Sequence, residues 1–330
     1  LSDRQAIQNE IAELSTEIDR IAETTKFNET LLLKGDNGMK NMYIHAHDAG
    51  LDGTLIENST HATFSMKALE PGNKYTIGGT QYEIGAGTNE EVAKALNLSD
   101  KFNASTGSFS LALGDTIMID GKSYTITENE DRANLQIKSS TISQLVVEGS
   151  TVVYNGNSVT RFSDMVASYS ANGKITDPAK PTLITAEQAY NLVSIELRAA
   201  STIGAVTRGA AGPTSWAASM NRSSTGVSTT IMNFIIKRGY VEVQNELRFN
   251  LHVGADADMG NKIQVEIQAM NSRSLGIQGL NVADTTGKSA TYAIDVIADA
   301  LQRVSDQRAE LGAAQNRLEH SINNLDNVVE

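Results

Sequence analysis

The sequence predicts an α+β protein in which long helices from the two chain ends enclose a middle section built mainly of β-strands. Three observations predict this class. Apolar residues repeat with heptad spacing near both termini, short alternating runs separated by Gly, Asn and Asp fill the middle, and the 330-residue length exceeds one typical hydrophobic core.

Residues 1–24 are predicted to form an amphipathic helix. Its apolar residues step by 4, 3, 4 and 3 positions, which is the spacing of a heptad seam. This regularity favours a helix that packs against another long helix over an ordinary surface helix. The seam residues are Ile7, Ile11, Leu14, Ile18 and Ile21.

Residues 290–329 carry the same spacing over a longer stretch, and at 1.5 Å per residue this helix would be about 60 Å long. Arg308 and Gln315 occupy seam positions as polar interruptions, and such residues can fix the register of a coiled coil at some cost in stability. We expect this helix to pair with residues 1–24. Its apolar seam residues are Ile294, Ile297, Leu301, Val304, Leu311, Leu318, Ile322, Leu325 and Val329.

The middle of the chain contains predicted hairpins, in which a Gly-containing turn separates two alternating runs. Residues 74–84 and 116–126 align at a spacing of 42, with Ile77 matching Ile119 and Tyr82 matching Tyr124, which indicates an internal duplication. Residues 151–162 form a further hairpin. Short helices are predicted over 89–97 and 186–200, and strands over 241–253 and 262–269 joined by the loop 254–260.

Composition excludes several classes of function. The chain has no cysteine, so it holds no disulfide and no Cys-ligated metal. A net charge of −12 argues against nucleic acid or an anionic membrane as a partner, and no apolar run is long enough to span a bilayer. No motif for a cofactor is present, and we expect none.

One group of residues could ligate a metal. His45, His47 and Asp48 form a His-x-His-Asp pattern, with His61 downstream, and on a strand the first two would share a face. A polar surface strand is the preferred interpretation. A zinc protease would need His-Glu-x-x-His, which the chain lacks, and we therefore predict neither a metal site nor an enzyme.

The C-terminal segment SDQRAELGAAQNRLEHSINNL (305–325) closely resembles the C-terminal signature of bacterial flagellins. Residues 7–35 and 247–282 resemble other parts of the flagellin core. The resemblance implies a discontinuous rod domain of residues 1–38 and 247–330. It leaves 39–246 as a variable outer domain, or as two domains divided near 175–185, and implies a fragment without the terminal inner-tube segments.

The same resemblance implies an extracellular structural subunit of the flagellar filament that serves motility. Its partners would be other flagellin subunits, an export chaperone and a cap protein, with no nucleic acid and no membrane. It further implies that a Toll-like innate immune receptor could recognise the core, and Glu10 and Arg308 match positions of the family's recognition surface.

Two other functions stay open. The chain could be a cell-surface binding protein or adhesin of flagellin type, with a ligand site in the outer domain. The hook–filament junction protein is a close structural rival, although the strength of the C-terminal match favours flagellin.

Overall fold

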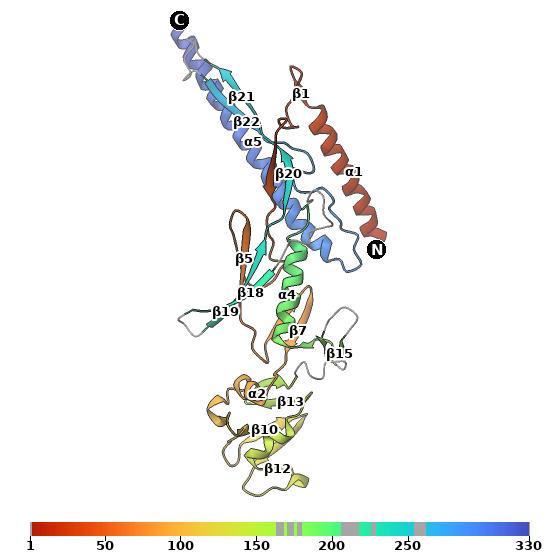
Figure 1. Ribbon diagram of the computed structural model, residues 1–330, viewed down its shortest axis with the longest axis vertical. Coiled ribbons are helices and arrows are strands. Elements are labelled where there is room, and N and C mark those ends of the chain that lie inside the picture. The colour runs from red at the N-terminus through yellow and green to blue at the C-terminus, as the bar shows by residue number, and fades with distance from the viewer. Residues whose placement is uncertain are drawn as a thin grey trace. The chain divides into compact units, whose positions relative to one another are not determined.

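The computed structural model describes residues 2–162, 168–169, 175–176, 180–205, 218–225, 229–253 and 262–329 (Figure 1). It mixes long helices with small, mostly antiparallel sheets, so the predicted α+β class is confirmed. The loop expected at 254–260 and the segment 206–217 lie outside the described residues.

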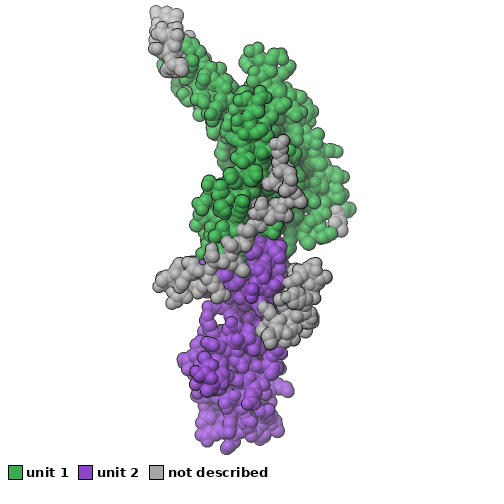
Figure 2. Space-filling model, viewed as in Figure 1, with its two compact units in different colours: residues 1–65, 197–221, 233–330 green, residues 66–196, 222–232 purple. Residues whose placement is uncertain are grey.

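The chain divides into two compact units (Figure 2). Unit 1 comprises residues 1–65, 197–221 and 233–330, and unit 2 comprises residues 66–196 and 222–232. These boundaries differ from the division predicted at 38/39 and 246/247. The reason is that β3 (Met39–Tyr43) pairs with β20 (Tyr240–Gln244) along five residues, which brings both segments into unit 1.

Unit 1 contains the two long helices, α1 (Ser2–Thr24) and α5 (Lys288–Val329), at nearly the positions predicted from the heptad spacing. The predicted strand over 241–253 proves to be two strands, β20 and β21 (Leu247–His252), with different partners. The other strands that lie wholly in unit 1 are β1 (Lys26–Phe27), β2 (Thr30–Leu31), β4 (Thr54–Glu57) and β22 (Lys262–Ile267), and β5 (His61–Lys67) runs from unit 1 into unit 2.

The hairpin of β21 and β22 lies along α5, as Figure 1 shows. Strand β22 alternates exposed and buried residues, and its buried side chains, Ile263, Val265 and Ile267, face Leu311 and Leu318 of the helix. This alternation is what a half-buried strand requires. The two-stranded hairpin and the C-terminal part of α5 therefore share one apolar layer.

Helix α1 packs differently from the prediction. Ile11 joins a cluster with Ala293 and Val296 of α5, together with Leu280 and Val282. Elsewhere α1 is attached to the segment 271–284 by polar contacts, and α5 is attached to the β21–β22 hairpin. Among the described residues, the structure does not show the two helices paired along a common seam, as the sequence had suggested.

Unit 2 confirms the predicted duplication. The hairpins β6–β7 (Lys74–Ile77, Thr80–Ile84) and β10–β11 (Thr116–Ile119, Lys122–Ile126) have the same register, with Ile77 paired to Thr80 and Ile119 to Lys122. The turn residues Gly79 and Gly121 both have positive φ, which a two-residue hairpin turn of this hand requires.

The predicted helices of unit 2 are also present. They are α2 (Asn89–Ala95) and α4 (Ala186–Ala200), the latter beginning after Thr185, whose hydroxyl accepts a hydrogen bond from the Gln188 amide at 3.2 Å. The remaining elements are α3 (Ile142–Leu145), η1 (Ser99–Lys101), η2 (Arg132–Asn134), η3 (Ser139–Thr141), β8 (Phe102–Asn103), β9 (Ser108–Phe109), β12 (Gln136–Ile137), β13 (Thr151–Tyr154), β14 (Asn157–Thr160), β15 (Ser168–Tyr169), β16 (Ile175–Thr176), β17 (Leu183–Ile184), β18 (Ala218–Thr225) and β19 (Thr229–Lys237).

Candidate functional site

Helix α1 exposes part of its apolar seam to solvent. Ile7, Leu14 and Ile21, which we call the α1 stripe, are 42–56% exposed and recur every seven residues. Residues seven apart lie on one face of a helix, so the three side chains form a line along it. The other two seam residues, Ile11 and Ile18, are partly buried.

Helix α5 shows the same division. Five exposed residues at a spacing of seven form the α5 stripe: Ile294, Leu301, Arg308, Gln315 and Ile322. Its apolar members are 54–65% exposed. The predicted seam residues Arg308 and Gln315 therefore lie in line with exposed apolar residues, and Gln315 donates a hydrogen bond to Glu319 one turn further on at 2.9 Å.

The packed face of α5 is shifted from the predicted seam. It includes Ala293, Val296 and Ala300, which are buried, and then Gln307 and Leu311. Gln307 is 5% exposed, and its side chain accepts a hydrogen bond from the Gln268 amide at 2.9 Å and donates one to the Glu266 carbonyl at 3.0 Å. This glutamine holds the helix against β22, and the sequence analysis did not single it out.

Polar side chains of α1 fix that helix to the segment before α5. Gln8 donates to the Leu280 carbonyl at 2.9 Å and accepts from the Val282 amide at 2.7 Å. Asp19 accepts hydrogen bonds from the amide and hydroxyl of Ser272 at 2.7 and 2.9 Å. These bonds orient α1 so that its stripe stays on the outside.

The two predicted receptor-contact residues are both exposed. Glu10 lies on α1 and Arg308 lies on α5, within the stripe of that helix. No ion pair within the described part of the chain occupies either side chain. Both charges are therefore accessible on the surface of unit 1.

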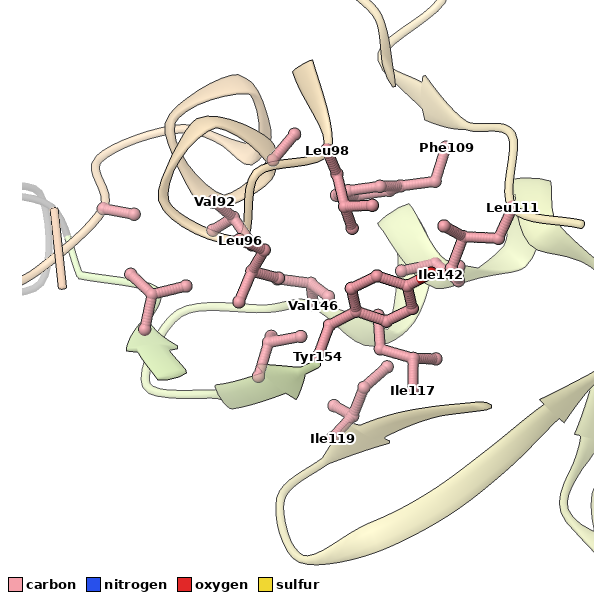
Figure 3. Packing of buried hydrophobic residues seen from close by; sticks show 14 of the residues in the cluster. Val92, Leu96, Leu98, Phe109, Leu111, Ile117, Ile119, Ile142, Val146 and Tyr154 are labelled. Atoms are coloured by element: carbon pink, nitrogen blue, oxygen red, sulfur yellow. The ribbon is translucent and has the colours of Figure 1, made fainter. Parts of the chain in front are cut away.

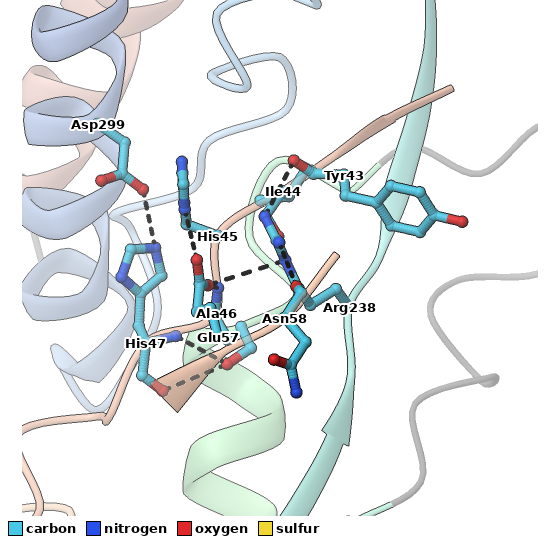
Figure 4. A network of polar contacts seen from close by, with 10 residues as sticks. Tyr43, Ile44, His45, Ala46, His47, Glu57, Asn58, Arg238 and Asp299 are labelled. Atoms are coloured by element: carbon cyan, nitrogen blue, oxygen red, sulfur yellow. Dashed lines mark hydrogen bonds and ion pairs between the residues drawn. The ribbon is translucent and has the colours of Figure 1, made fainter. Parts of the chain in front are cut away.

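The two histidines of the His-x-His-Asp pattern contact separate partners (Figure 4). His45 Nδ1 lies 2.8 Å from Glu57, whereas His47 Nε2 lies 3.4 Å from Asp299 of α5. Asp48 accepts a hydrogen bond from the Gly50 amide, and His61 contacts the Thr60 hydroxyl. Across the described residues, no three His, Asp or Glu side chains form a group that could hold a metal ion.

Arg238 organises the same region, as Figure 4 shows. Its guanidinium donates to the carbonyl oxygens of Tyr43, Ile44 and Asn58 and lies 3.8 Å from Glu57. Burial opposes ionisation of Glu57, but hydrogen bonds from His45 and the Ala46 amide, together with the charge of Arg238, hold the pKa of Glu57 below its ordinary value.

A shallow groove of about 280 Å³ lies on unit 1 between α1 and the segments near 242 and 272. Asp19, Glu23 and Glu242 line it together with Lys34 and Arg273, so its charge is mixed. Nothing in this lining selects one class of ligand. Within the described residues, no helix is both long and apolar enough to cross a membrane.

Comparison with known proteins finds similarity to one family. Residues 294–330 match the model of the bacterial flagellin C-terminal helical region. Along 333 aligned residues covering the whole chain, the protein is 25% identical to Flagellin B of Vibrio anguillarum, and over 98% of the chain it is 24% identical to a flagellin of Clostridium tyrobutyricum. The chain is similar to bacterial flagellins along its whole length.

A third relative is similar over a shorter stretch at higher identity. A flagellin of Bacillus subtilis (strain 168) is 35% identical over 101 aligned residues, which are 24% of this chain and 33% of that protein. The chain spans about 60% of the length of the two flagellins that it matches from end to end, 58% for Vibrio and 60% for Clostridium.

Proposed function

We propose that this flagellin chain is the body of a structural subunit of the flagellar filament, outside the cell, where subunits polymerise into a helical filament for motility. The role requires a rigid element with contact surfaces on more than one side, and head-to-tail contacts that do not close into a ring. Unit 1 supplies the rigid element, because α5 is 42 residues long and is fixed along the β21–β22 hairpin.

The observation that carries this proposal is the pair of stripes on α1 and α5. Exposed apolar side chains scattered singly are normal on a protein surface, but lines of them at heptad spacing suit packing against another helix. Each buried apolar side chain would contribute roughly 1.5–3 kcal/mol to such a contact. The stripes are accordingly the surfaces that neighbouring helices of the assembled filament would cover.

Arg308 and Gln315 would set the register of the α5 stripe. A polar residue in an apolar seam excludes pairings that leave it without a partner, at a cost in stability. Replacing both by leucine should keep the helix and change the helical twist of the filament, which electron cryomicroscopy measures. An unchanged twist would show that the two residues do not set the register.

We further propose that unit 1 is the rod and unit 2 the outer domain of the subunit, and that the protein acts structurally and not as an enzyme. The nested chain order favours this division, since unit 2 interrupts unit 1 at residues 66–196 and again at 222–232. An export chaperone and a cap protein would be transient partners. Recognition by a Toll-like receptor would use the accessible charges of Glu10 and Arg308.

The test substitutes the α1 stripe in the protein expressed at the full length of its gene. A variant with Ile7, Leu14 and Ile21 each changed to Gln should keep its helical circular dichroism. It should lose filaments in electron microscopy and in sedimentation, because the contact surface is gone while the fold remains.

The matched control changes three exposed apolar residues of unit 1 outside the stripes, Phe27, Met39 and Ile56, to Gln. It should form filaments as the unsubstituted protein does. Filaments of ordinary length and number from the stripe variant would contradict the proposal, and equal loss in both variants would show that the stripes are not the specific contact.

A further inference from the structure

Unit 2 contains three copies of one hairpin, of which the sequence analysis aligned two. The third is β13–β14, 35 residues after the second, and its turn is Asn155-Gly156. Asn155 and Gly156 both have positive φ, as do Gly78-Gly79 and Asp120-Gly121. All three hairpins therefore use the same two-residue turn.

The hydrogen bonds before each hairpin are also the same. A glycine amide donates to the carbonyl of the residue five positions after the turn glycine in every copy: Gly72 to Ile84, Gly114 to Ile126 and Gly149 to Arg161, at 2.8, 2.9 and 2.7 Å. The next side chain accepts a bond from the amide three residues earlier, at Asn73, Asp115 and Ser150. Three copies of one structural unit explain this agreement better than chance.

Each hairpin has a parallel neighbour at its last residue. Ile84 pairs with Ile184, Ile126 with Ile137, and Arg161 with Ala86. The amide of the following residue donates to the neighbour's carbonyl each time, from Gly85, Thr127 and Phe162, at 2.9, 2.9 and 2.8 Å. In the third copy the neighbour comes from earlier in the chain, so residues 86 and 161 lie side by side.

Residues 86–162 have their own hydrophobic core (Figure 3). Every buried member of this cluster, from Ala86 to Val159, lies between those two ends. Leu96, Ile117 and Ile142 are almost fully buried in it. A segment with a separate core and adjacent ends is what an inserted domain looks like.

The residues on either side of this segment have buried side chains of their own. Ile77 and Ile84 of the first hairpin and Leu183, Ile184 and Val193 after the insertion are all at most 2% exposed. The hairpin and the later strand β17 form one three-stranded sheet with the order β17-β7-β6. This sheet is complete without any strand from 86–162.

Arg161 marks the closure of the segment. It occupies the position held by isoleucine in the other two copies, and its guanidinium donates to the carbonyls of Ala86, at 3.2 Å, and Gly87. It also faces Glu148 at 3.6 Å. The exception in the repeat thus falls where the two ends of the segment meet.

We infer that residues 86–162 are an inserted body built from two further copies of the hairpin β6–β7, after which it is inserted. This body opens and closes independently of the rest of unit 2, and Arg161 holds its two ends together. Contacts such as the 3.3 Å bond from the Thr160 hydroxyl to Glu83 join the two bodies without merging their cores. The inference concerns unit 2 alone and does not depend on the proposed filament role.

The test is hydrogen exchange of the full chain, read by mass spectrometry. Ile84→Ala and Ile126→Ala are a matched pair, because the two residues hold the same place in two copies and are 0% and 1% exposed. Truncating a buried isoleucine should speed exchange by roughly 30-fold or more in the body that contains it. Ile126→Ala should therefore act on 86–162 alone.

Ile84→Ala should act on the amides of Glu83 and Gly85 and leave those of Thr125 and Thr127 protected. If either variant speeds exchange equally in both bodies, unit 2 opens as one and the inference is overturned. If Ile126→Ala leaves the body too unstable to measure, Ile126→Val and Ile84→Val give the same comparison with a smaller effect.

Arg161→Ile restores the residue of the other copies and removes the bonds to Ala86 and Gly87. We expect the amides of Ala86 and Phe162 to exchange about tenfold faster, by the loss of one or two charge-assisted bonds. An unchanged rate at both amides would exclude Arg161 from the closure.

Discussion

Arg238 Nε donates a hydrogen bond to the backbone carbonyl of Ile44 across 2.8 Å, joining positions 194 residues apart in the chain. The same guanidinium bonds the Asn58 carbonyl at 2.8 Å and the Tyr43 carbonyl at 3.4 Å. Its side chain is only 10% exposed, so these carbonyls have little access to water that could replace it. One arginine, which follows β19, thus joins the end of β3 and the end of β4 within unit 1.

Replacing Arg238 by Met should therefore destabilise unit 1 by about 3 kcal/mol, because buried acceptors lose their donor and Glu57 loses its nearby cation. Chemical denaturation of the full chain, followed by circular dichroism, measures this change. Arg248→Met is the control, since Arg248 is 59% exposed and pairs with Glu266 on the surface. It should cost less than about 1 kcal/mol. Equal costs would show that the buried bonds of Arg238 carry no special weight.

Gly204 should not tolerate a side chain. It has φ +79°, and a Cβ there would lie 1.9 Å from the carbonyl oxygen of Gly276, a backbone atom that cannot turn aside. Gly276 has the same φ of +79° but open space around the position of its missing Cβ. Gly276→Ala should lower the stability only by the energy that alanine needs to adopt the left-handed conformation, about 1–2 kcal/mol.

Gly204→Ala should lower the thermal midpoint of unit 1 several degrees further than Gly276→Ala, because the clash adds to the same conformational cost. Differential scanning calorimetry of both variants gives the comparison directly. Matching midpoints would mean that the segment around Gly276 moves away at little cost.

The pH dependence of stability should include a contribution from Glu57. Its folded pKa lies below the ordinary value of 4.5, so ionised Glu57 stabilises the fold above that pH. The contribution is lost as pH falls through the lowered pKa. The thermal midpoints of the unsubstituted protein and Glu57→Gln should therefore differ by a constant amount above pH 5 or so and converge in more acid solution. A gap that widens in acid would have the wrong sign for this assignment.

The sequence predicted the helices well because their signals are local. Heptad spacing located α1 and α5, and the helix predicted over 186–200 has the bounds of α4. The same spacing could not separate the two faces of α5. Positions 293, 300 and 307 pack while 294, 301 and 308 are exposed, and each exposed position directly follows a packed one. Which set packs is decided by other elements: Leu280, Val282 and Ile11 beside residues 293 and 296, and β22 beside Gln307 and Leu311.

The partners of the polar side chains could be predicted less well from the sequence. His45 and His47 are two residues apart, yet Glu57 and Asp299 draw them to different elements. Nothing near either histidine in the sequence indicates those partners. The hairpin over 151–162 was predicted but not aligned with the other two, because Arg161 and Tyr154 replace isoleucines and the repeat is clear only in its hydrogen bonds.

Gly312 offers a stabilising substitution in the middle of α5. A Cβ at this position would meet nothing within 4 Å, and glycine costs a helix interior roughly 0.5–1 kcal/mol relative to alanine. Gly312→Ala should raise stability by about that amount, measured by denaturation of the isolated chain. Filament assembly provides the second readout. If a neighbouring helix approaches α5 closely at Gly312, the variant will be more stable as a monomer and yet assemble poorly. If assembly is unchanged, the space beside Gly312 is open in the filament as well, and the contacts of α5 lie on its stripe.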